Sequence, residues 1–384
     1  MAYSMFKVPN LIVSGEGSME YLSQIEGKKA IIVTGGSSMK KFGFIEKVQN
    51  YLSKAGIEVM VIDEVEPNPT LETVLKGSKT MLEFQPDWII ALGGGSSLDA
   101  AKGMWMFYEY PKLDFKSIIE ANSIPKLRNK AKFIAIPSTS GTASEITGCS
   151  VITDTTTHAK YPIVSYELTP DVAILDIELP AKMPKSITAH TGMDVMSHAL
   201  EAYVSTIANA LTDPLAIEAV RLVFEWLPKA YNNGKDMEAR EAMHHASTIA
   251  GMAFANVSLG IVHSLAHSLG GQFGVTHGLA NAILLPYVIE YNRKNTNKYD
   301  LIEKKLGIDN LSDSIKNLNE ILGIPSSFNK LTNNEINEEK FKEVLIEMSE
   351  NAFADACTGT NPRETSAEEL AKIYKNAYYG VSVE

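Results

Sequence analysis

Short apolar runs alternate with helical patterns through the first half of the chain. Between the earlier runs, apolar residues recur with helical spacing over Phe44–Ala55 and Thr70–Phe84. Strands followed by helices in this rhythm predict an α/β domain with a mostly parallel sheet and helices on both faces. The predicted strands are Ala30–Thr34, Val59–Ile62, Trp88–Leu92, Phe133–Ile136 and Val172–Leu175.

The second half of the chain lacks these strand signals from about Met183 onward. Helical periodicity dominates there, Asp213-Pro214 is typical of a helix start, and Tyr231–Lys235 predicts a loop. The polar stretch Asn295–Glu347 predicts solvated surface helices. With a boundary near Pro180–Pro184, we expect an α/β domain of residues 1–181 and an all-helical domain of residues 182–384.

Composition narrows the classes of function. The chain has 384 residues and a net charge of −11, which disfavours nucleic acids and anionic membranes as partners. Its two cysteines, Cys149 and Cys357, provide neither a disulfide framework nor a thiolate metal site. No apolar run reaches the roughly 18 residues of a membrane span, and the first residues do not resemble a signal peptide. We therefore expect a cytoplasmic protein.

Two loops that follow neighbouring predicted strands have the composition of a phosphate site. Gly93-Gly94-Gly95-Ser96-Ser97 leads from a strand into a helix expected to begin near Leu98–Asp99. Glycines let a phosphate approach the backbone, and a helix N-terminus offers free N–H groups. Pro137–Ser144, rich in hydroxyls, follows the next strand. Either loop alone is equally typical of an ordinary turn, but the two together favour a dinucleotide site.

The loop after the first predicted strand bears on the choice between NAD and NADP. It reads Gly35-Gly36-Ser37-Ser38, with Lys40 and Lys41 nearby and no carboxylate. An acidic side chain here would bind the ribose 2′-hydroxyl of NAD and repel a 2′-phosphate. Small residues with lysines therefore favour NADP(H), although a solvated loop with incidental lysines has the same composition.

Histidines gather around a carboxylate in the helical half. Asp194 and His198 are four residues apart, as are His263 and His267, so each pair shares one helix face. His277 follows a glycine-rich break. Each pair alone is more typical of a solvated or satisfied helix face. Together, imidazoles and a carboxylate in apolar surroundings favour a divalent transition metal.

These motifs resemble the iron-containing (group III) alcohol dehydrogenases over essentially the whole chain. The resemblance is carried by Gly93–Lys102, Pro137–Glu145, Thr191–Tyr203 and Gly251–Pro286, and Asp355–Glu364 is similar to clostridial butanol and ethanol dehydrogenases. It implies a Rossmann-like N-terminal domain, a helical C-terminal domain of the dehydroquinate synthase-like type, and an active site in the cleft between them. It implies metal binding by Asp194, His198, His263 and His277, with His267 near the metal as a candidate proton carrier.

The resemblance also implies cofactor and substrate positions. Many NAD-dependent members carry an acidic residue where this chain has Gly35, which agrees with NADP(H). Gly94, Gly95, Ser96 and Asp99 would hold the pyrophosphate, Gly35, Gly36 and Ser37 would lie by the adenosine ribose, and Asn68, Ser138, Thr139, Thr142 and Lys160 would line the rest of the cofactor site. Phe254, Cys149 and Cys357 match variable substrate positions.

The favoured function is a metal-dependent dehydrogenase that transfers hydride between NADP(H) and a small primary alcohol or aldehyde. Four protein ligands plus a substrate oxygen favour Fe(II) over Zn(II), because catalytic zinc usually has three protein ligands. A lyase resembling dehydroquinate synthase, with NAD, or a metal hydrolase without redox chemistry are the alternatives. His190, one turn before Asp194, could take the place of His267. We expect a homodimer or higher homo-oligomer.

Overall fold

A six-stranded parallel sheet is the centre of the first of two structural units, Met1–Met183 and Pro184–Glu384. The structure, a computed structural model, describes residues 4–156, 159–331 and 336–382. The strand order is β1-β8-β5-β4-β2-β3, and every neighbouring pair is parallel. The strands are β1 (Leu11–Ser14), β2 (Lys29–Gly35), β3 (Glu58–Val65), β4 (Trp88–Gly93), β5 (Lys132–Pro137) and β8 (Val172–Leu175).

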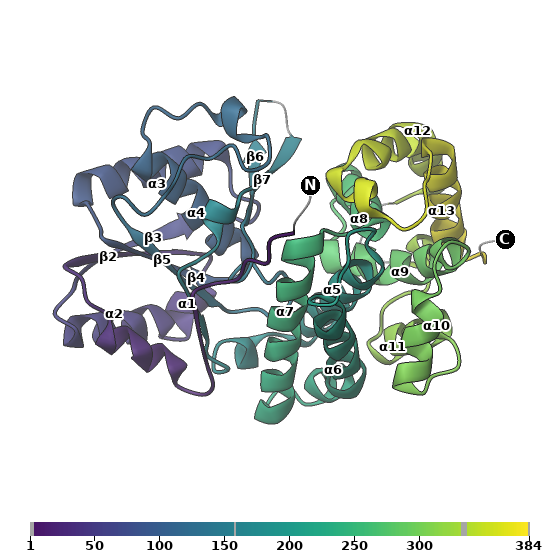
Figure 1. The fold of residues 1–384 in the computed structure, drawn as a ribbon, viewed down its shortest axis with the longest axis horizontal. Coiled ribbons are helices and arrows are strands. Elements are labelled where there is room, and N and C mark those ends of the chain that lie inside the picture. Colours follow the sequence, from purple (N-terminus) through teal and green to yellow (C-terminus); the bar gives the residue numbers. More distant parts are fainter. Residues whose placement is uncertain (1–3, 157–158, 332–335, 383–384) are drawn as a thin grey trace. The chain divides into compact units, whose positions relative to one another are not determined.

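Both faces of this sheet are buried beneath helices, because alternate apolar residues of each central strand face opposite sides. Ile31, Ile89 and Phe133 belong to the cluster that packs on α3 (Leu71–Phe84) and α4 (Gly95–Glu109). The intervening residues pack on the other face against η1 (Ser18–Gln24), α1 (Ser38–Lys41) and α2 (Phe44–Lys54) (Figure 1). The predicted parallel sheet with helices on both faces is confirmed.

The structure adds strands that the sequence pattern did not predict. β1 has four residues, only half-buried at best, so its apolar signal is weak. β6 (Cys149–Asp154) and β7 (Ala159–Val164) form a separate antiparallel pair. The helix expected near Leu98–Asp99 instead begins at Gly95. Glycine and serine are tolerated there because the N–H groups of a first helical turn need no intrahelical acceptor.

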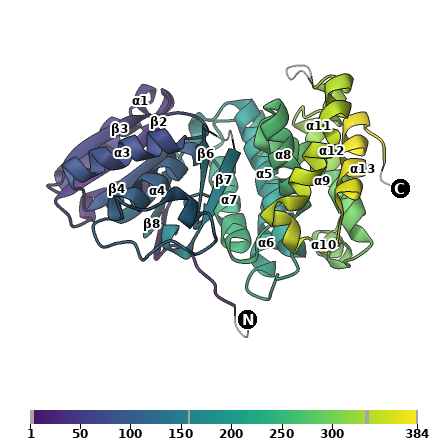
Figure 2. The same ribbon diagram turned by 90° about the horizontal axis from the view of Figure 1, so that it is seen from above.

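The second unit is entirely helical in its described part, as predicted (Figure 2). Its apolar core runs through the long helices, and α6 continues to Asn232 because Tyr231 packs on that core, so the predicted loop starts later. The helices are α5 (Lys185–Val204), α6 (Asp213–Asn232), α7 (Met237–Val257), α8 (Ile261–Phe273), α9 (His277–Arg293), α10 (Lys298–Leu306), α11 (Leu311–Ile321), α12 (Glu338–Ala354) and α13 (Ala367–Tyr379).

Short 3₁₀ helices and capping residues complete the two units. Thr70 caps α3 and Asp236 caps α7, each accepting a hydrogen bond from a backbone N–H three residues on. The 3₁₀ helices are η2 (Phe115–Ile118), η3 (Tyr166–Leu168), η4 (Pro180–Lys182), η5 (Phe328–Lys330) and η6 (Ala356–Thr360). In the described ranges, no single helix is long and apolar enough to cross a membrane, although α7 and α8, bent by 101°, pass that test as a pair.

Candidate metal centre and cofactor site

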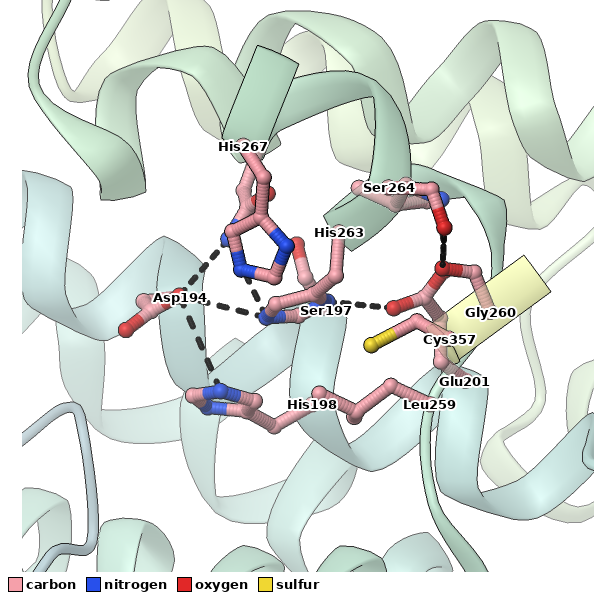
Figure 3. A network of polar contacts seen from close by, with 12 residues as sticks. Asp194, Ser197, His198, Glu201, Leu259, Gly260, His263, Ser264, His267 and Cys357 are labelled. Atoms are coloured by element: carbon pink, nitrogen blue, oxygen red, sulfur yellow. Dashed lines mark hydrogen bonds and ion pairs between the residues drawn. The ribbon is translucent and has the colours of Figure 1, made fainter. Parts of the chain in front are cut away.

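One carboxylate oxygen in the helical unit lies at the meeting point of three imidazoles. Asp194 Oδ1 is 3.7 Å from His263 Nε2 and 3.9 Å from His198 Nε2 (Figure 3). It is 3.4 Å from His277 Nε2. The donor atoms of Asp194, His263 and His277 all lie within 4.8 Å of one another. His198 lies just outside that tight group, with its ring stacked on His263 at 4.6 Å between centroids.

Three helices bring these side chains together. Asp194 and His198 are one turn apart on α5, and His263 projects from the first turn of α8. His277 is the first residue of α9. The N-terminus of α9 packs so tightly on α5 that a Cβ at Gly278 would lie 2.1 Å from the carbonyl oxygen of His190. Glycine at position 278 therefore permits the approach that brings His277 to Asp194.

The electrostatics of this group favour a bound cation. Burial acts to raise the pKa of Asp194, but His198, His277 and His263 outweigh it and hold that pKa well below its usual range. Burial also acts to lower the pKa of His263, yet Glu201 and Asp194 raise it to about 9. Asp194 is thus ionised, and the carboxylates around His263 attract positive charge.

The spacing of the donor atoms fits a transition metal. Metal–ligand distances of about 2.0–2.2 Å place neighbouring ligand atoms about 3 to 4 Å apart, and the three Nε2 atoms lie 3.4 to 3.9 Å from Asp194 Oδ1. Asn281 is fully buried beside them, and its Oδ1 has no hydrogen-bond partner among the described residues. The amide nitrogen of Asn281, rather than this oxygen, faces the group, 2.7 Å from Asp194 Oδ1. A carboxylate oxygen with imidazole nitrogens converging on it is a donor set that suits a divalent transition metal.

His267 points to a different partner from its neighbour His263. Its Nδ1 lies 2.9 Å from Asp355 Oδ2, and its ring stacks on His277 at 5.3 Å between centroids. The side chain is 44% exposed. Nδ1 of His267, a carboxylate oxygen of Asp355 and Sγ of Cys357 form a second close donor group. Neither of the two close donor groups found in the described ranges contains His190, and its role as an alternative to His267 stays a prediction.

Three residues that contact the candidate metal ligands or His267 were not predicted from the sequence. Glu201 contacts His263 Nδ1, and Asn281 Nδ2 donates to Asp194 Oδ1 at 2.7 Å. Asp355 orients His267 from 88 positions away in sequence. Helical spacing could have indicated Glu201, three residues after His198, and Asn281, four after His277. Nothing in the sequence near Asp355 indicates a histidine partner.

In the first unit, the two predicted phosphate loops lie side by side at the carboxyl ends of β4 and β5. Ser138 N–H donates to the carbonyl of Gly93 at 2.8 Å. Gly93 has φ 143°, and a Cβ there would lie 2.8 Å from Ser97 Oγ, so this turn requires glycine. A Cβ at Gly95 would meet the Thr142 methyl at 3.0 Å. Backbone N–H groups of the first turn of α4 are thus presented beside the threonine-rich loop.

A chain of hydrogen bonds links further predicted cofactor residues. Asn68 N–H donates to Ser96 Oγ at 3.2 Å, and Lys160 Nζ donates to Asn68 Oδ1 at 2.8 Å. Asn68 has φ 57°, a left-handed conformation that asparagine tolerates. Thr139 lies beside Gly94, whose Cβ position is 3.6 Å from the Thr139 methyl. The structure therefore brings Asn68, Ser96, Thr139 and Lys160 to the same region of the first unit.

Asp99 is half-buried, and both of its carboxylate oxygens are hydrogen-bonded within the first unit. Its Oδ1 accepts from Ser144 Oγ at 2.8 Å, and its Oδ2 accepts from the Val151 N–H at 3.1 Å. One turn later, the fully buried Lys102 donates to the carbonyls of Ser144, Thr147 and Cys149. Through these bonds Asp99 fastens the hydroxyl-rich loop to α4. The pyrophosphate contact expected of Asp99 from the sequence stays a prediction.

The loop predicted to govern the choice of dinucleotide begins at the end of β2. A Cβ at Gly35 would lie only 2.1 Å from the carbonyl oxygen of Val65 on β3, so an acidic residue there requires β3 to move. Gly36 follows with φ 63° and open space around its Cβ position. Ser37 is half-exposed at the N-cap of α1. Space for a 2′-phosphate partner therefore exists at positions 36 and 37 rather than at 35.

The predicted substrate residues fall in both units. The Phe254 ring stacks on His198 at 4.2 Å between centroids. Cys357 is the second residue of η6, its N–H donates to Asp355 Oδ1, and it lies among the residues around His263 (Figure 3). Both residues are therefore near the Asp194 group. Cys149 begins β6 in the first unit.

Two family models match nearly the whole chain. "Iron-containing alcohol dehydrogenase" matches residues 9–177, and "Fe-containing alcohol dehydrogenase family, C-terminal" matches residues 188–378. A curated relative, the NADPH-dependent butanol dehydrogenase of Clostridium saccharobutylicum, is 50% identical over 99% of both chains. The aldehyde-alcohol dehydrogenase of Streptococcus pneumoniae is 40% identical over 97% of this chain and 46% of its own length.

Solved structures of similar sequence share the fold. The iron-containing alcohol dehydrogenase of Thermococcus thioreducens has a TM-score of 0.91 and 38% identity, with 98% of this chain and 100% of that chain covered. A 1,3-propanediol oxidoreductase has the same TM-score at 35% identity and the same coverage.

Proposed function

Because the chain belongs to the iron-containing alcohol dehydrogenase family, we propose that it interconverts small primary alcohols and aldehydes with NADP(H) and Fe(II). The observation that carries this proposal is the convergence of three Nε2 atoms on Asp194 Oδ1 within one helical unit. The similarity to a butanol dehydrogenase described as NADPH-dependent supports both the cofactor and a short aliphatic substrate.

Asp194, His198, His263 and His277 would hold the metal. When bound, the metal supplies Lewis-acid polarisation of the substrate oxygen, and the nicotinamide supplies or accepts the hydride. The four side chains contribute a single negative charge, and three of them are almost completely buried. Four protein donors with room for a substrate oxygen suit Fe(II) better than Zn(II), which usually takes three protein ligands in catalytic sites.

The cofactor would be bound by the first unit. The N–H groups at the start of α4 are suited to a pyrophosphate, with Gly94, Gly95 and Ser96 forming that turn. Asn68, Ser138, Thr139, Thr142 and Lys160 supply the donors and small side chains around it. The absence of a carboxylate at Gly35, Gly36 and Ser37 favours a 2′-phosphate and therefore NADP(H).

His267 is the residue we assign to proton transfer. Its Nδ1 is held by Asp355, and its half-exposed ring stacks on the metal-ligand candidate His277. In aldehyde reduction the substrate oxygen gains a proton, and an imidazole at this place can deliver it, directly or through ribose hydroxyls of the cofactor. Phe254 and Cys357 would border the substrate on the same unit, and Cys149 stays a candidate substrate residue of the first unit.

An anaerobic assay tests the proposed reaction. Protein loaded with Fe(II) or Zn(II) is given butyraldehyde with NADPH and NADH in parallel, and oxidation of the cofactor is followed by absorbance. We expect aldehyde-dependent oxidation with the highest kcat/KM for Fe(II) and NADPH. If neither NADPH nor NADH is oxidised with either metal, the proposed reaction is overturned.

A further inference from the structure

Glu201 is a buried carboxylate whose position connects the metal centre to the start of a helix. It lies on α5 at 4% exposure, one turn beyond His198. Its Oε1 accepts from the Val262 N–H at 2.6 Å, and its Oε2 contacts His263 Nδ1 (Figure 3). A single side chain thus contacts two consecutive residues in the first turn of α8.

The contact with Val262 caps α8 from outside the helix. Gly260, the N-cap residue, makes no side-chain capping hydrogen bond. The first N–H groups of a helix lack intrahelical acceptors and carry partial positive charge, so a carboxylate is favourable there. A Cβ at Gly260 would lie 2.9 Å from Glu201 Oε1, and the glycine therefore makes room for the carboxylate. Glu201 fixes where α8 begins relative to α5.

The contact with His263 decides which ring nitrogen faces Asp194. A carboxylate accepts, so His263 presents Nδ1–H to Glu201 and directs Nε2 toward Asp194 Oδ1, 3.7 Å away. An imidazole whose other nitrogen is tied to a carboxylate is held in one orientation and is a stronger metal ligand. Among the described residues, Glu201 forms an ion pair with His263 alone. Asp194 and Glu201 together supply two negative charges at this centre.

We propose that Glu201 is a positioning residue that presents His263 Nε2 to the metal and matches the charge of a divalent ion. This inference rests on the proposed function, because it requires that the Asp194 group binds a metal. Glu201 does not touch the metal in this assignment. It acts through His263, so its loss is seen first in metal affinity.

Substitution by the isosteric amide is the sharpest test. In Glu201→Gln the amide oxygen can still accept from the Val262 N–H, but the amide NH₂ cannot accept the hydrogen bond that His263 Nδ1–H donates to Oε2 in the wild type. We expect Zn(II) to bind about 10- to 100-fold more weakly, measured by competition with a chromophoric chelator in the absence of substrate. Glu201→Asp retains the charge and should recover part of the affinity.

Glu303 offers a matched control. It is 9% exposed, accepts from the Leu311 N–H at 2.7 Å at the start of α11, and pairs with Arg293. Glu303→Gln therefore removes a buried helix-capping charge of the same kind, away from the histidines. We expect it to lower thermal stability and to leave the Zn(II) affinity unchanged. An equal loss of affinity in Glu201→Gln and Glu303→Gln would reduce Glu201 to a structural role.

A spectroscopic measurement on the wild type needs no variant to fold. In the Zn(II)-loaded protein, ¹⁵N spectra should show His263 with its proton on Nδ1 and the metal on Nε2. The opposite arrangement, or an unchanged Zn(II) affinity in Glu201→Gln, overturns the role of Glu201 while the metal site stands. Wild-type protein that binds no Zn(II) at all instead overturns the proposed function, and this inference with it.

Discussion

Sequence spacing placed the histidines on shared helix faces, but their partners differ from residue to residue. His263 and His267 are one turn apart on α8, as expected, with ring centroids 6.0 Å from each other. His263 faces Asp194 and Glu201, whereas His267 faces Asp355. Neighbours on one helix face can thus serve different chemistry, because side-chain direction is set by the element packed against each of them.

Replacement of His267 by alanine separates its role from metal binding. We expect His267→Ala to retain metal content and NADPH affinity while kcat falls by about 10²–10⁴-fold, the usual contribution of general acid–base catalysis. Metal analysis, NADPH titration and a pH–rate profile check this expectation. Loss of metal would instead make His267 a ligand, and near-normal kcat with an unchanged pH profile would leave it a structural residue.

A charge placed at Gly36 tests the position of the adenosine ribose. Position 35 is unsuitable, because a side chain there meets the Val65 carbonyl, whereas Gly36 has open space and a φ that aspartate and asparagine tolerate. We expect Gly36→Asp to lower the ratio of kcat/KM for NADPH to that for NADH by about tenfold or more, because like charges repel. Gly36→Asn, equal in shape and neutral, should keep the wild-type ratio. If both variants behave alike, charge at this loop is not what selects the cofactor.

At the scale of elements, loop and helix termini carry most of the candidate cofactor site. The turn from β4 into α4 depends on Gly93, and Asp99 and Lys102 on α4 hold the next loop beside it. The glycines were recognisable from the sequence as a turn. The role of the buried Lys102, which holds the hydroxyl-rich loop against α4, was not recognisable from the sequence. Its acceptors are backbone carbonyls, which any sequence provides.

The helix α7 contains a buried histidine that makes stability depend on pH. Burial, aided by His245, lowers the pKa of His244 to about 3. As pH falls, the His244 side chain of the unfolded chain is protonated near the ordinary pKa of about 6.5, whereas that of the folded chain stays neutral until about pH 3. The contribution of neutral His244 to the free energy of unfolding is therefore complete above pH 6.5 and is lost as pH falls toward 3.

His244→Gln should remove that dependence. We expect the difference in unfolding free energy between wild type and variant to shrink by up to about 1.4 kcal/mol per pH unit between pH 6 and pH 4. Urea unfolding at several pH values measures this difference. His245→Gln, at a half-buried neighbour, removes only the smaller cause of the lowered His244 pKa and should keep most of the wild-type pH dependence. Parallel pH curves for wild type and His244→Gln would contradict the assignment.

At the scale of the whole molecule, the candidate metal centre lies where three helices of one unit meet. α5, α8 and α9 meet at Asp194, His263 and His277, so a bound ion would link segments more than 80 residues apart. A ligand present at about 1,000 times its Kd stabilises the folded state by about 4 kcal/mol. Metal removal should therefore be visible in the unfolding of the helical unit.

Chelation should lower the Tm of the wild-type protein by roughly 10 °C, since 1 kcal/mol corresponds to about 2–4 °C in a unit of this size. His263→Ala, which removes a ligand candidate, should bind little metal and show no further shift with chelator. Differential scanning calorimetry with and without chelator makes the comparison. A wild-type Tm that chelation leaves unchanged would mean that no metal links these helices.

The sequence by itself determined the parallel sheet, the change to helices near Met183 and the helix faces that Asp194 shares with His198 and His263 with His267. These follow from local rules, because hydrophobic periodicity sets the elements and i, i+4 spacing sets the shared faces. The choice of Asp194, His198, His263 and His277 as metal ligands came from the resemblance to a known family. Only the tertiary structure decided which residues each side chain contacts. Glu201 contacts His263, Asp355 contacts His267, Ser144 donates to Asp99, and the Val65 carbonyl leaves no room for a side chain at Gly35. Such contacts join segments distant in the chain, and they depend on how whole elements pack rather than on the pattern within any one of them.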